Sequence, residues 1–400
     1  MNNKIPFLAH TEEERNAMLN QLGISSINDL FKNIPDDFYL KKPLNLPEPL
    51  NEWELQKHID EKIKSNKTCF ELNSFLGGGV YNHYVPAVID SIASRGEFLT
   101  AYTPYQPEMS QGLLQALNNF LNKISEITSL PTVTCSHYDG ATALAEATWM
   151  AVSKTGIKSI LVTRSLFPHY REVLDTYCYA RNVKITEVPC NLTTGCLDLN
   201  AIEDLDLSDF AALVIQAPNS YGVIEEFGKL NSFKKKNKLL TICSMHPYLP
   251  FVREFDKELF DILTFEGQSL GVNMYAGGAH LGILACKKQL RHLTPGRLIG
   301  NVCDIYGNPS LALVFEDREQ HVARDRATSN ICSNQALNAL RAGVFIDLLG
   351  SDGIYDLYSQ ANIKAIGLMK ALISTKCLKA SYKGEIFNEF VISFNSKADL

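Results

Sequence analysis

The sequence lacks the marks of a membrane, exported or nucleic-acid-binding protein. No apolar run among its 400 residues approaches the ~20 residues that a membrane-spanning helix needs. Residues 1–15 have neither the apolar core of a signal peptide nor the Arg- and Ser-rich composition of a transit peptide. The net charge of −6 provides no basic excess for nucleic acid or an anionic membrane. We therefore expect a cytoplasmic protein with no nucleic-acid partner and no membrane partner.

Metal-binding and disulfide patterns are missing too. The ten cysteines are scattered, none forms a Cys-x-x-Cys pair, and none lies at zinc-ligand spacing beside paired histidines. Cys135, Cys243 and Cys286 lie within apolar runs, which is typical of small buried residues in a reducing compartment. We expect no metal site.

What is present is the composition of a globular enzyme, with 46% hydrophobic and 20% charged residues. From about residue 132, short apolar runs alternate with helical periodicity. The expected strands are residues 132–136, 159–163, 184–189, 211–217, 239–243, 261–265 and 281–286, with helices such as 141–154 and 168–181 between them. Apolar strands separated by helices are typical of a mainly parallel sheet covered on both faces. The sequence therefore predicts an α/β fold of the doubly wound kind.

The ends of the chain differ from this pattern. Thr11 and Glu14 form a capping box before a helix that Gly23 ends, and helices are also expected at residues 26–33 and 53–64 around a proline-rich extended segment. Near the C-terminus we expect helices at 334–349 and 353–375 and a strand at 389–394. We therefore predict an N-terminal helical arm (1–65), a large α/β domain (66–330) and the start of a small C-terminal domain (331–400).

Two loops are candidates for a functional site. In residues 75–86, three consecutive glycines precede Tyr81, His83 and Tyr84. Glycines permit backbone conformations closed to other residues and the close approach of a ligand or another chain, although a tight turn with packed tyrosines explains them equally well. Residues 100–108 form a second loop, which two prolines make rigid and which presents polar tips for a site or an interface. Its candidate residues are Tyr102, Tyr105 and Gln106.

Two further strings lie where helices follow strands or loops. At Asp139 and Gly140 an expected strand turns into an Ala-rich helix, whose free N-terminal amides suit a phosphate. Packing of that helix on the sheet explains the small residues equally well. Residues 328–335 are uncharged and amide-rich before another helix, and capping by Ser333 or Asn334 explains only part of this string.

Lysine is absent from residues 261–286, which include the glycine-rich string 267–271. In an enzyme that uses pyridoxal phosphate, this region supplies the lysine that forms the Schiff base. A self-sufficient enzyme of that class would need a lysine from elsewhere in the chain.

Together these strings resemble the first subunit of glycine dehydrogenase (decarboxylating), the P-protein of the glycine cleavage system. The matching segments follow one another along almost the whole chain: residues 10–14, 75–77, 101–108, 138–147, 267–271, 295–300 and 318–340. The resemblance implies a fold-type-I pyridoxal-phosphate-enzyme architecture. It also implies that a second, homologous subunit carries the lysine and the cofactor, while this chain carries neither.

The resemblance further implies roles for particular residues. No residue of this chain has a Schiff-base role, and a vestigial cofactor region comprises Asp139, Gly140, His246, Gln268 and Ser269. The residues that would border the partner's active site and the substrate channel are Tyr81, His83, Tyr84, Tyr102, Tyr105 and Gln106. The implied reaction is decarboxylation of glycine, with transfer of the aminomethyl group to the lipoyl arm of H-protein.

The sequence departs from the family's pattern at three places. His246 stands where the family usually has an acid that could face a pyridine nitrogen, and Asn82 stands where the family commonly has Asp. The family also continues beyond this C-terminus, so a shortened small domain is expected. These departures leave open a second hypothesis, in which the chain is a decayed, non-catalytic structural or regulatory remnant of the subunit.

Overall fold

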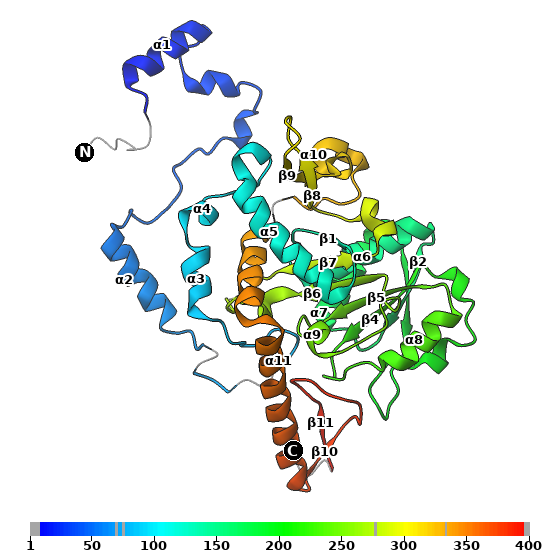
Figure 1. Cartoon of the computed structure of the whole chain (residues 1–400). Coiled ribbons are helices and arrows are strands. Elements are labelled where there is room, and N and C mark those ends of the chain that lie inside the picture. The colour runs from blue at the N-terminus through cyan, green and yellow to red at the C-terminus, as the bar shows by residue number, and fades with distance from the viewer. Residues whose placement is uncertain (1–8, 69–70, 74–76, 276–277, 333, 396–400) are drawn as a thin grey trace. The chain divides into compact units, whose positions relative to one another are not determined.

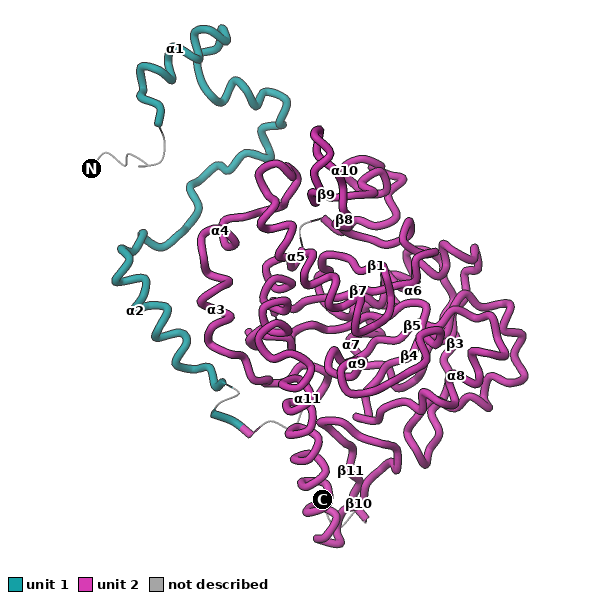
Figure 2. Tube along the Cα trace, viewed as in Figure 1, with its two compact units in different colours: residues 1–72 teal, residues 73–400 magenta. Residues whose placement is uncertain are grey.

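The computed structural model describes residues 9–68, 71–73, 77–275, 278–332 and 334–395 (Figure 1). Three groups of residues named above lie outside these ranges: Phe75 and Leu76 of the candidate loop 75–86, Gly277 of the lysine-free segment 261–286, and the candidate cap Ser333. The chain divides into two compact units, residues 1–72 and 73–400 (Figure 2). The predicted division of the second unit at residue 330 stays a prediction. Within the described ranges, no helix is both long and apolar enough to cross a membrane.

The first unit contains two helices that the sequence predicts. Helix α1 (Glu12–Leu22) begins with the capping box of Thr11 and Glu14, and Gly23 ends it at φ 69°. Helix α2 (Glu52–Ile63) begins at Asn51 with a second capping box. Neither helix has a buried residue. Between them, a 3-10 turn, Ile27–Phe31, replaces the short α-helix expected there.

The second unit is built around a seven-stranded sheet. Its strands are β1 (Thr132–Val133), β2 (Ser159–Thr163), β3 (Lys184–Val188), β4 (Ala212–Ala217), β5 (Leu240–Met245), β6 (Ile262–Glu266) and β7 (Gly282–Cys286). Its helices are α3 (Ala87–Ala93), α4 (Gly96–Leu99), α5 (Pro107–Thr128), α6 (Gly140–Thr155), α7 (Pro168–Arg181), α8 (Phe227–Lys236), α9 (Leu249–Val252), α10 (Gln320–Ala323) and α11 (Ala336–Ser374).

The sheet is mainly parallel, as predicted. The strand order is β1-β7-β6-β5-β4-β2-β3. Strands β3, β2, β4, β5 and β6 run parallel to one another, whereas β7 is antiparallel to both β6 and β1. The carboxyl ends of β4, β5 and β6 therefore meet at one edge of the sheet, where α/β folds bind their ligands.

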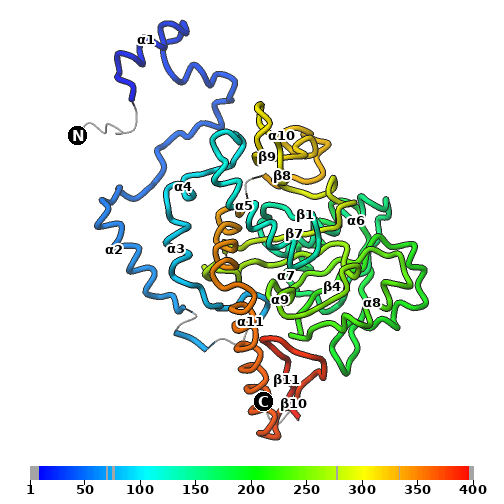
Figure 3. Tube along the Cα trace, in the orientation of Figure 1, coloured from blue at the N-terminus to red at the C-terminus, as the bar shows by residue number. Residues whose placement is uncertain are grey.

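Helices cover both faces of the sheet, and each face has its own apolar core. Along β4, Leu213 and Ile215 belong to one core, while Ala212 and Val214 belong to the other. This alternation follows from the two-residue period of a strand. Helices α6 and α7 pack on one face, and α5 and α11, which lie side by side (Figure 3), pack on the other.

Three elements differ from the expectation. The loop predicted through residue 108 ends earlier, because Pro107 opens the long helix α5, as proline favours at a first helical position. Strands β8 (Leu298–Cys303) and β9 (Pro309–Val314) form an unpredicted antiparallel hairpin. The two predicted C-terminal helices are one element, α11, broken at Gly350, which has φ 61° and ψ −172°. Strands β10 (Leu378–Ala380) and β11 (Ile392–Phe394) then pair antiparallel.

Candidate active site

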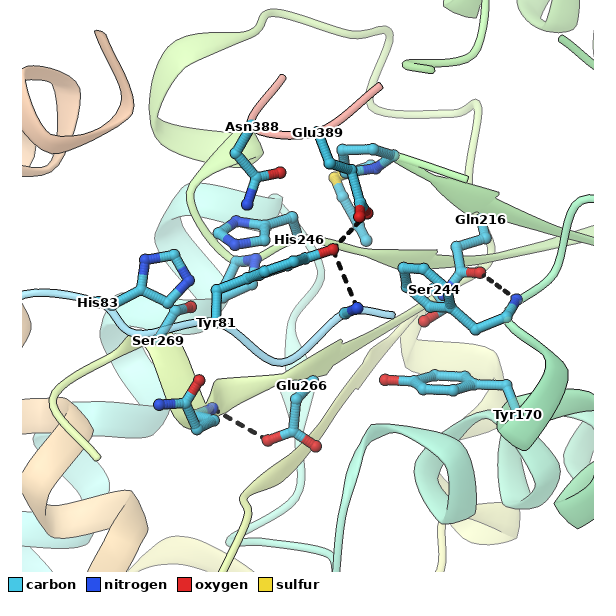
Figure 4. Close-up of a pocket in the computed structure, with 16 residues that line it drawn as sticks. Tyr81, His83, Tyr170, Gln216, Ser244, His246, Glu266, Ser269, Asn388 and Glu389 are labelled. Atoms are coloured by element: carbon cyan, nitrogen blue, oxygen red, sulfur yellow. Dashed lines mark hydrogen bonds between the residues drawn. The ribbon is translucent and has the colours of Figure 1, made fainter. Parts of the chain in front are cut away.

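A small cavity lies at the carboxyl ends of β4, β5 and β6 (Figure 4). The strand ends contribute Gln216, Ser244 and Glu266. Two segments far away in the sequence close it, the glycine-rich loop with Tyr81 and the C-terminal segment with Glu389. The other lining residues are Gly79, His83, Phe167, Tyr170, Pro218, Met245, His246, Pro247, Gln268, Ser269 and Asn388.

Tyr81 joins the two closing segments. Its hydroxyl donates to the Glu389 carboxylate and accepts the backbone N–H of Gly79 at 2.9 Å. Burial, together with the charge of Glu389, raises the pKa of Tyr81, and burial raises the pKa of Glu389. Glycine is required at position 222, because a Cβ there would lie 2.1 Å from the Glu389 carbonyl oxygen, whereas a Cβ at Gly77 would displace the Glu389 carboxylate.

His246 is held as a neutral imidazole. Its Nδ1 accepts the backbone N–H of Tyr248 at 3.2 Å, so its proton lies on Nε2. Burial, with a smaller effect of nearby His83, lowers the pKa of His246 well below its usual value. Nε2 is buried and has no hydrogen-bond partner among the described residues. Burial likewise lowers the pKa of His83 to about 4, and the two rings lie 5.5 Å apart.

The Glu266 carboxylate accepts hydrogen bonds from three backbone N–H groups. Its Oε2 accepts from Gly140, the first residue of α6, at 2.9 Å, and its Oε1 accepts from Gln268 at 3.0 Å and Leu281 at 3.1 Å. The carboxylate of Asp139, the N-cap residue of α6, accepts a hydrogen bond from the backbone N–H of Thr142 at 2.7 Å. Two of the α6 amides that the sequence suggested for a phosphate, those of Gly140 and Thr142, are therefore bonded to carboxylates of this chain.

Comparison with known proteins decides the family. A sequence model of the glycine cleavage system P-protein matches residues 6–399. The chain belongs to the glycine cleavage system P-protein family.

Relatives in this family are similar over nearly their whole length. The chain is 40% identical over 395 residues to the probable glycine dehydrogenase (decarboxylating) subunit 1 of Carboxydothermus hydrogenoformans, covering 98% of this chain and 88% of that protein. It is 40% identical over 390 residues to the protein of the same name from Bacillus subtilis, covering 97% and 86%.

Solved structures give the same fold. A crystal structure of glycine decarboxylase (P-protein) in inhibitor-bound form superposes with a TM-score of 0.87 at 35% identity, covering 98% of this chain and 87% of that chain. Glutamate decarboxylase of Lactobacillus brevis superposes at 0.63 with 14% identity, covering 91% and 82%, and shares the fold alone. The fold is that of the fold-type-I pyridoxal-phosphate enzymes, as the resemblance implied.

The residues around this P-protein cavity do not fit pyridoxal phosphate. No lysine is among the described residues that line it. His246 presents an N–H donor, whereas a protonated pyridine nitrogen is partnered by an acid. The space left between the side chains is about 30 Å³, room for one or two waters and far below the ~300 Å³ at which small-molecule sites begin.

Only some of the predicted site residues line this cavity. Tyr81 and His83, predicted at the partner's site, line this chain's own cavity together with His246, Gln268 and Ser269. Asp139 and Gly140 adjoin it at the start of α6. Tyr84 is exposed. The part of the chain that the structure describes holds no cluster of three His, Cys, Asp or Glu residues that could bind a metal.

The second predicted loop borders a different cavity, of about 270 Å³. Tyr102 lines it, as do Arg297 and Asn334. Tyr105 accepts a 2.9 Å hydrogen bond from Arg297 Nη2, and the Arg297 guanidinium lies 5.3 Å from the Tyr105 ring centre. Gln106 is exposed and is the N-cap residue of α5, without a side-chain capping bond.

Sequence reasoning missed Glu266 and Glu389, and also Phe167 and Tyr170. A signal existed for Glu266, because it is a charged residue at the carboxyl end of a mainly apolar strand, where parallel strands present site residues. Phe167 and Tyr170 flank Pro168 at the start of α7 and give no such signal. Glu389 joins the site only through tertiary contact with Tyr81, 308 residues away.

Proposed function

We propose that this chain is the cofactor-free subunit of a two-subunit glycine decarboxylase. Its partner would be the second P-protein subunit, which carries the Schiff-base lysine and pyridoxal phosphate. Together they would decarboxylate glycine and pass the aminomethyl group to the lipoyl arm of H-protein. The observation that carries the proposal is membership of the P-protein family combined with a cofactor region that offers carboxylates and no lysine.

In the proposed complex, pyridoxal phosphate bound to the second subunit would supply an electron sink for the decarboxylation of glycine. This chain would contribute position and exclusion of water. Tyr81, His83 and Tyr84 on one loop, and Tyr102, Tyr105 and Gln106 on the other, would border the partner's active site and the path of the lipoyl arm. Rigid loops that orient a substrate can lower the activation free energy of a reaction without taking part in bond making or breaking.

Reconstitution tests the proposal. The purified chain, a second P-protein subunit and lipoylated H-protein are assayed for glycine-dependent exchange of labelled CO2, singly and mixed. We expect exchange only when both subunits are present. A well-folded chain that binds the second subunit but restores no exchange would instead support the remnant hypothesis.

A chemical test addresses the cofactor. After incubation with pyridoxal phosphate and reduction by borohydride, we expect no specific pyridoxyl-lysine in this chain, and one such lysine in the second subunit. Stoichiometric labelling of one lysine here would establish a self-sufficient enzyme and end the proposal.

Two variants test the loop that bears Tyr81 and His83. In the assembled enzyme we expect Tyr81→Phe and His83→Ala to lower the exchange rate by roughly 10- to 100-fold, the size of a misplacement of about 1 Å. Affinity for the second subunit, measured by titration, should change little. Tyr179→Phe, whose side chain is 88% exposed on α7, is the matched control. Unchanged exchange in both loop variants would contradict this placement.

A further inference from the structure

Glu266 lies where three segments of the chain bring backbone N–H groups together. These groups belong to Gly140 at the start of α6, Gln268 in the turn after β6, and Leu281 before β7, at 2.9, 3.0 and 3.1 Å. The Glu266 side chain is only 13% exposed. Three converging N–H groups on one carboxylate make the arrangement typical of an anion cradle rather than of a surface cap.

The electrostatics of α6 favour an anion at this point. The helix has 16 residues, and its N-terminus carries a partial positive charge that stabilises a nearby carboxylate or phosphate. His280 adds a nitrogen 3.6 Å from Glu266 Oε1. The cradle is therefore suited to a single oxyanion, and the Glu266 carboxylate supplies one.

Glycines allow the three segments to approach. A Cβ at Gly140 would lie 2.2 Å from the Tyr170 hydroxyl and 3.0 Å from the backbone N of Glu266. A Cβ at Gly282 would lie 2.3 Å from the carbonyl oxygen of Asp139. The cradle is thus built into the backbone, and side chains larger than glycine would separate its walls.

A second, independent observation points to a polar ligand beside the cradle. Ser269 is 3% exposed, lines the same cavity, and its Oγ has no hydrogen-bond partner among the described residues. A buried hydroxyl without a partner costs stability. The Glu266 carboxylate fills the amide part of the site and leaves this donor unused.

We propose that Glu266 is a built-in substitute for a bound phosphate. Its carboxylate occupies the amide cradle at the start of α6, completes the fold there and keeps phosphate-bearing ligands out. The cradle still takes an oxyanion once this side chain is removed. A phosphate on the same amides would otherwise meet the charges of Glu266 and Asp139, and like charges at about 4 Å repel by several kcal/mol near a protein surface.

This inference rests on the proposed function and deepens it. It explains why pyridoxal phosphate would bind only to the second subunit. A lysine introduced into residues 261–286 would then not be sufficient for cofactor binding. The test uses the full chain without the second subunit. Its failure and the failure of the exchange assay are therefore separate results.

The experiment compares thermal unfolding of the wild-type chain and Glu266→Ala in increasing inorganic phosphate, with chloride replaced to keep the ionic strength constant. We expect the variant to unfold at a lower temperature than the wild type in chloride, because three buried N–H groups lose their acceptor. Phosphate should raise its midpoint saturably, by roughly 3 °C at 100 times the dissociation constant. The wild-type midpoint should show only the non-saturating rise that phosphate, as a kosmotropic salt, gives folded proteins in general.

Two further variants serve as controls. Glu146→Ala removes another buried carboxylate of α6, one that bonds to the Ser329 hydroxyl at 2.7 Å. This variant should unfold at a lower temperature than the wild type, and phosphate should not raise its midpoint saturably. Glu266→Gln keeps the size but not the charge, and its midpoint should lie below that of the wild type.

Several results would overturn the proposal. One is a saturable phosphate response in the wild type equal to that of Glu266→Ala, and another is no response in a folded Glu266→Ala. A Glu266→Gln midpoint equal to that of the wild type would also exclude the role of charge. If Glu266→Ala does not fold in chloride, the yield of folded protein after refolding in phosphate replaces the midpoint. No gain over chloride would then reject the proposal.

Discussion

Replacing Tyr81 by phenylalanine isolates one hydrogen-bonding group of the cavity. The ring and its packing remain, while the hydroxyl that accepts from Gly79 and donates to Glu389 is lost. Both contacts are part-buried, so water can replace the hydroxyl only in part.

The magnitude follows from these two contacts. Leaving a buried donor or acceptor without a partner costs about 1–3 kcal/mol, and the contact to a carboxylate is at the upper end of this range. We therefore expect Tyr81→Phe to lower the free energy of unfolding of the isolated chain by ~1–3 kcal/mol. At about 2.1 cal/mol/K of unfolding entropy per residue, 1 kcal/mol shifts the midpoint of a chain of this size by roughly 1 °C, so the midpoint should fall by about 1–4 °C.

The assay is thermal unfolding of the isolated chain, with Tyr179→Phe as the control. This measurement separates two explanations of the glycine-rich loop. If the Tyr81 hydroxyl served only the partner's active site, the isolated chain would be as stable as the wild type. A midpoint for Tyr81→Phe that equals that of the control would refute a stabilising role of the hydroxyl within the chain. Retained stability with reduced exchange would assign the hydroxyl to the partner.

Other substitutions test other parts of the structure. Gly140→Ala should cost about 1–3 kcal/mol in chemical denaturation, because the new Cβ would overlap the Tyr170 hydroxyl, whereas Gly228→Ala in α8 has nothing within 4 Å and should cost nothing. Phe345→Ala should cost ~3–5 kcal/mol, because this residue of α11 has a fully buried side chain. Burial raises the pKa of Glu225 to about 7, so the folded state holds a proton there that the unfolded state loses near pH 4.5. The wild type should therefore lose up to about 3 kcal/mol relative to Glu225→Gln as the pH rises from 4.5 through 7. A difference that stays constant over this pH range would contradict the assignment.

Local structure was largely predictable where the signal lies in neighbouring residues. The capping box of Thr11 and the stop at Gly23 bound α1 as expected. Strands β2 and β4 and helix α7 lie within a residue of the ranges that apolar runs and Pro168 indicated. Helix α5 was not predicted, and only its first two residues, Pro107 and Glu108, fall within the expected loop.

The sequence by itself determined the mainly parallel α/β fold, the family, and the absence of lysine between residues 261 and 286. These properties depend on periodicity and on residue identity along the chain. Only the tertiary structure decided what meets at the cavity beside the strand ends: Glu266 on the first amide of α6, and Tyr81 bonded to Glu389. Such contacts join residues more than 100 positions apart, and their geometry depends on strand ends meeting at one edge and on glycines that let separate backbones approach.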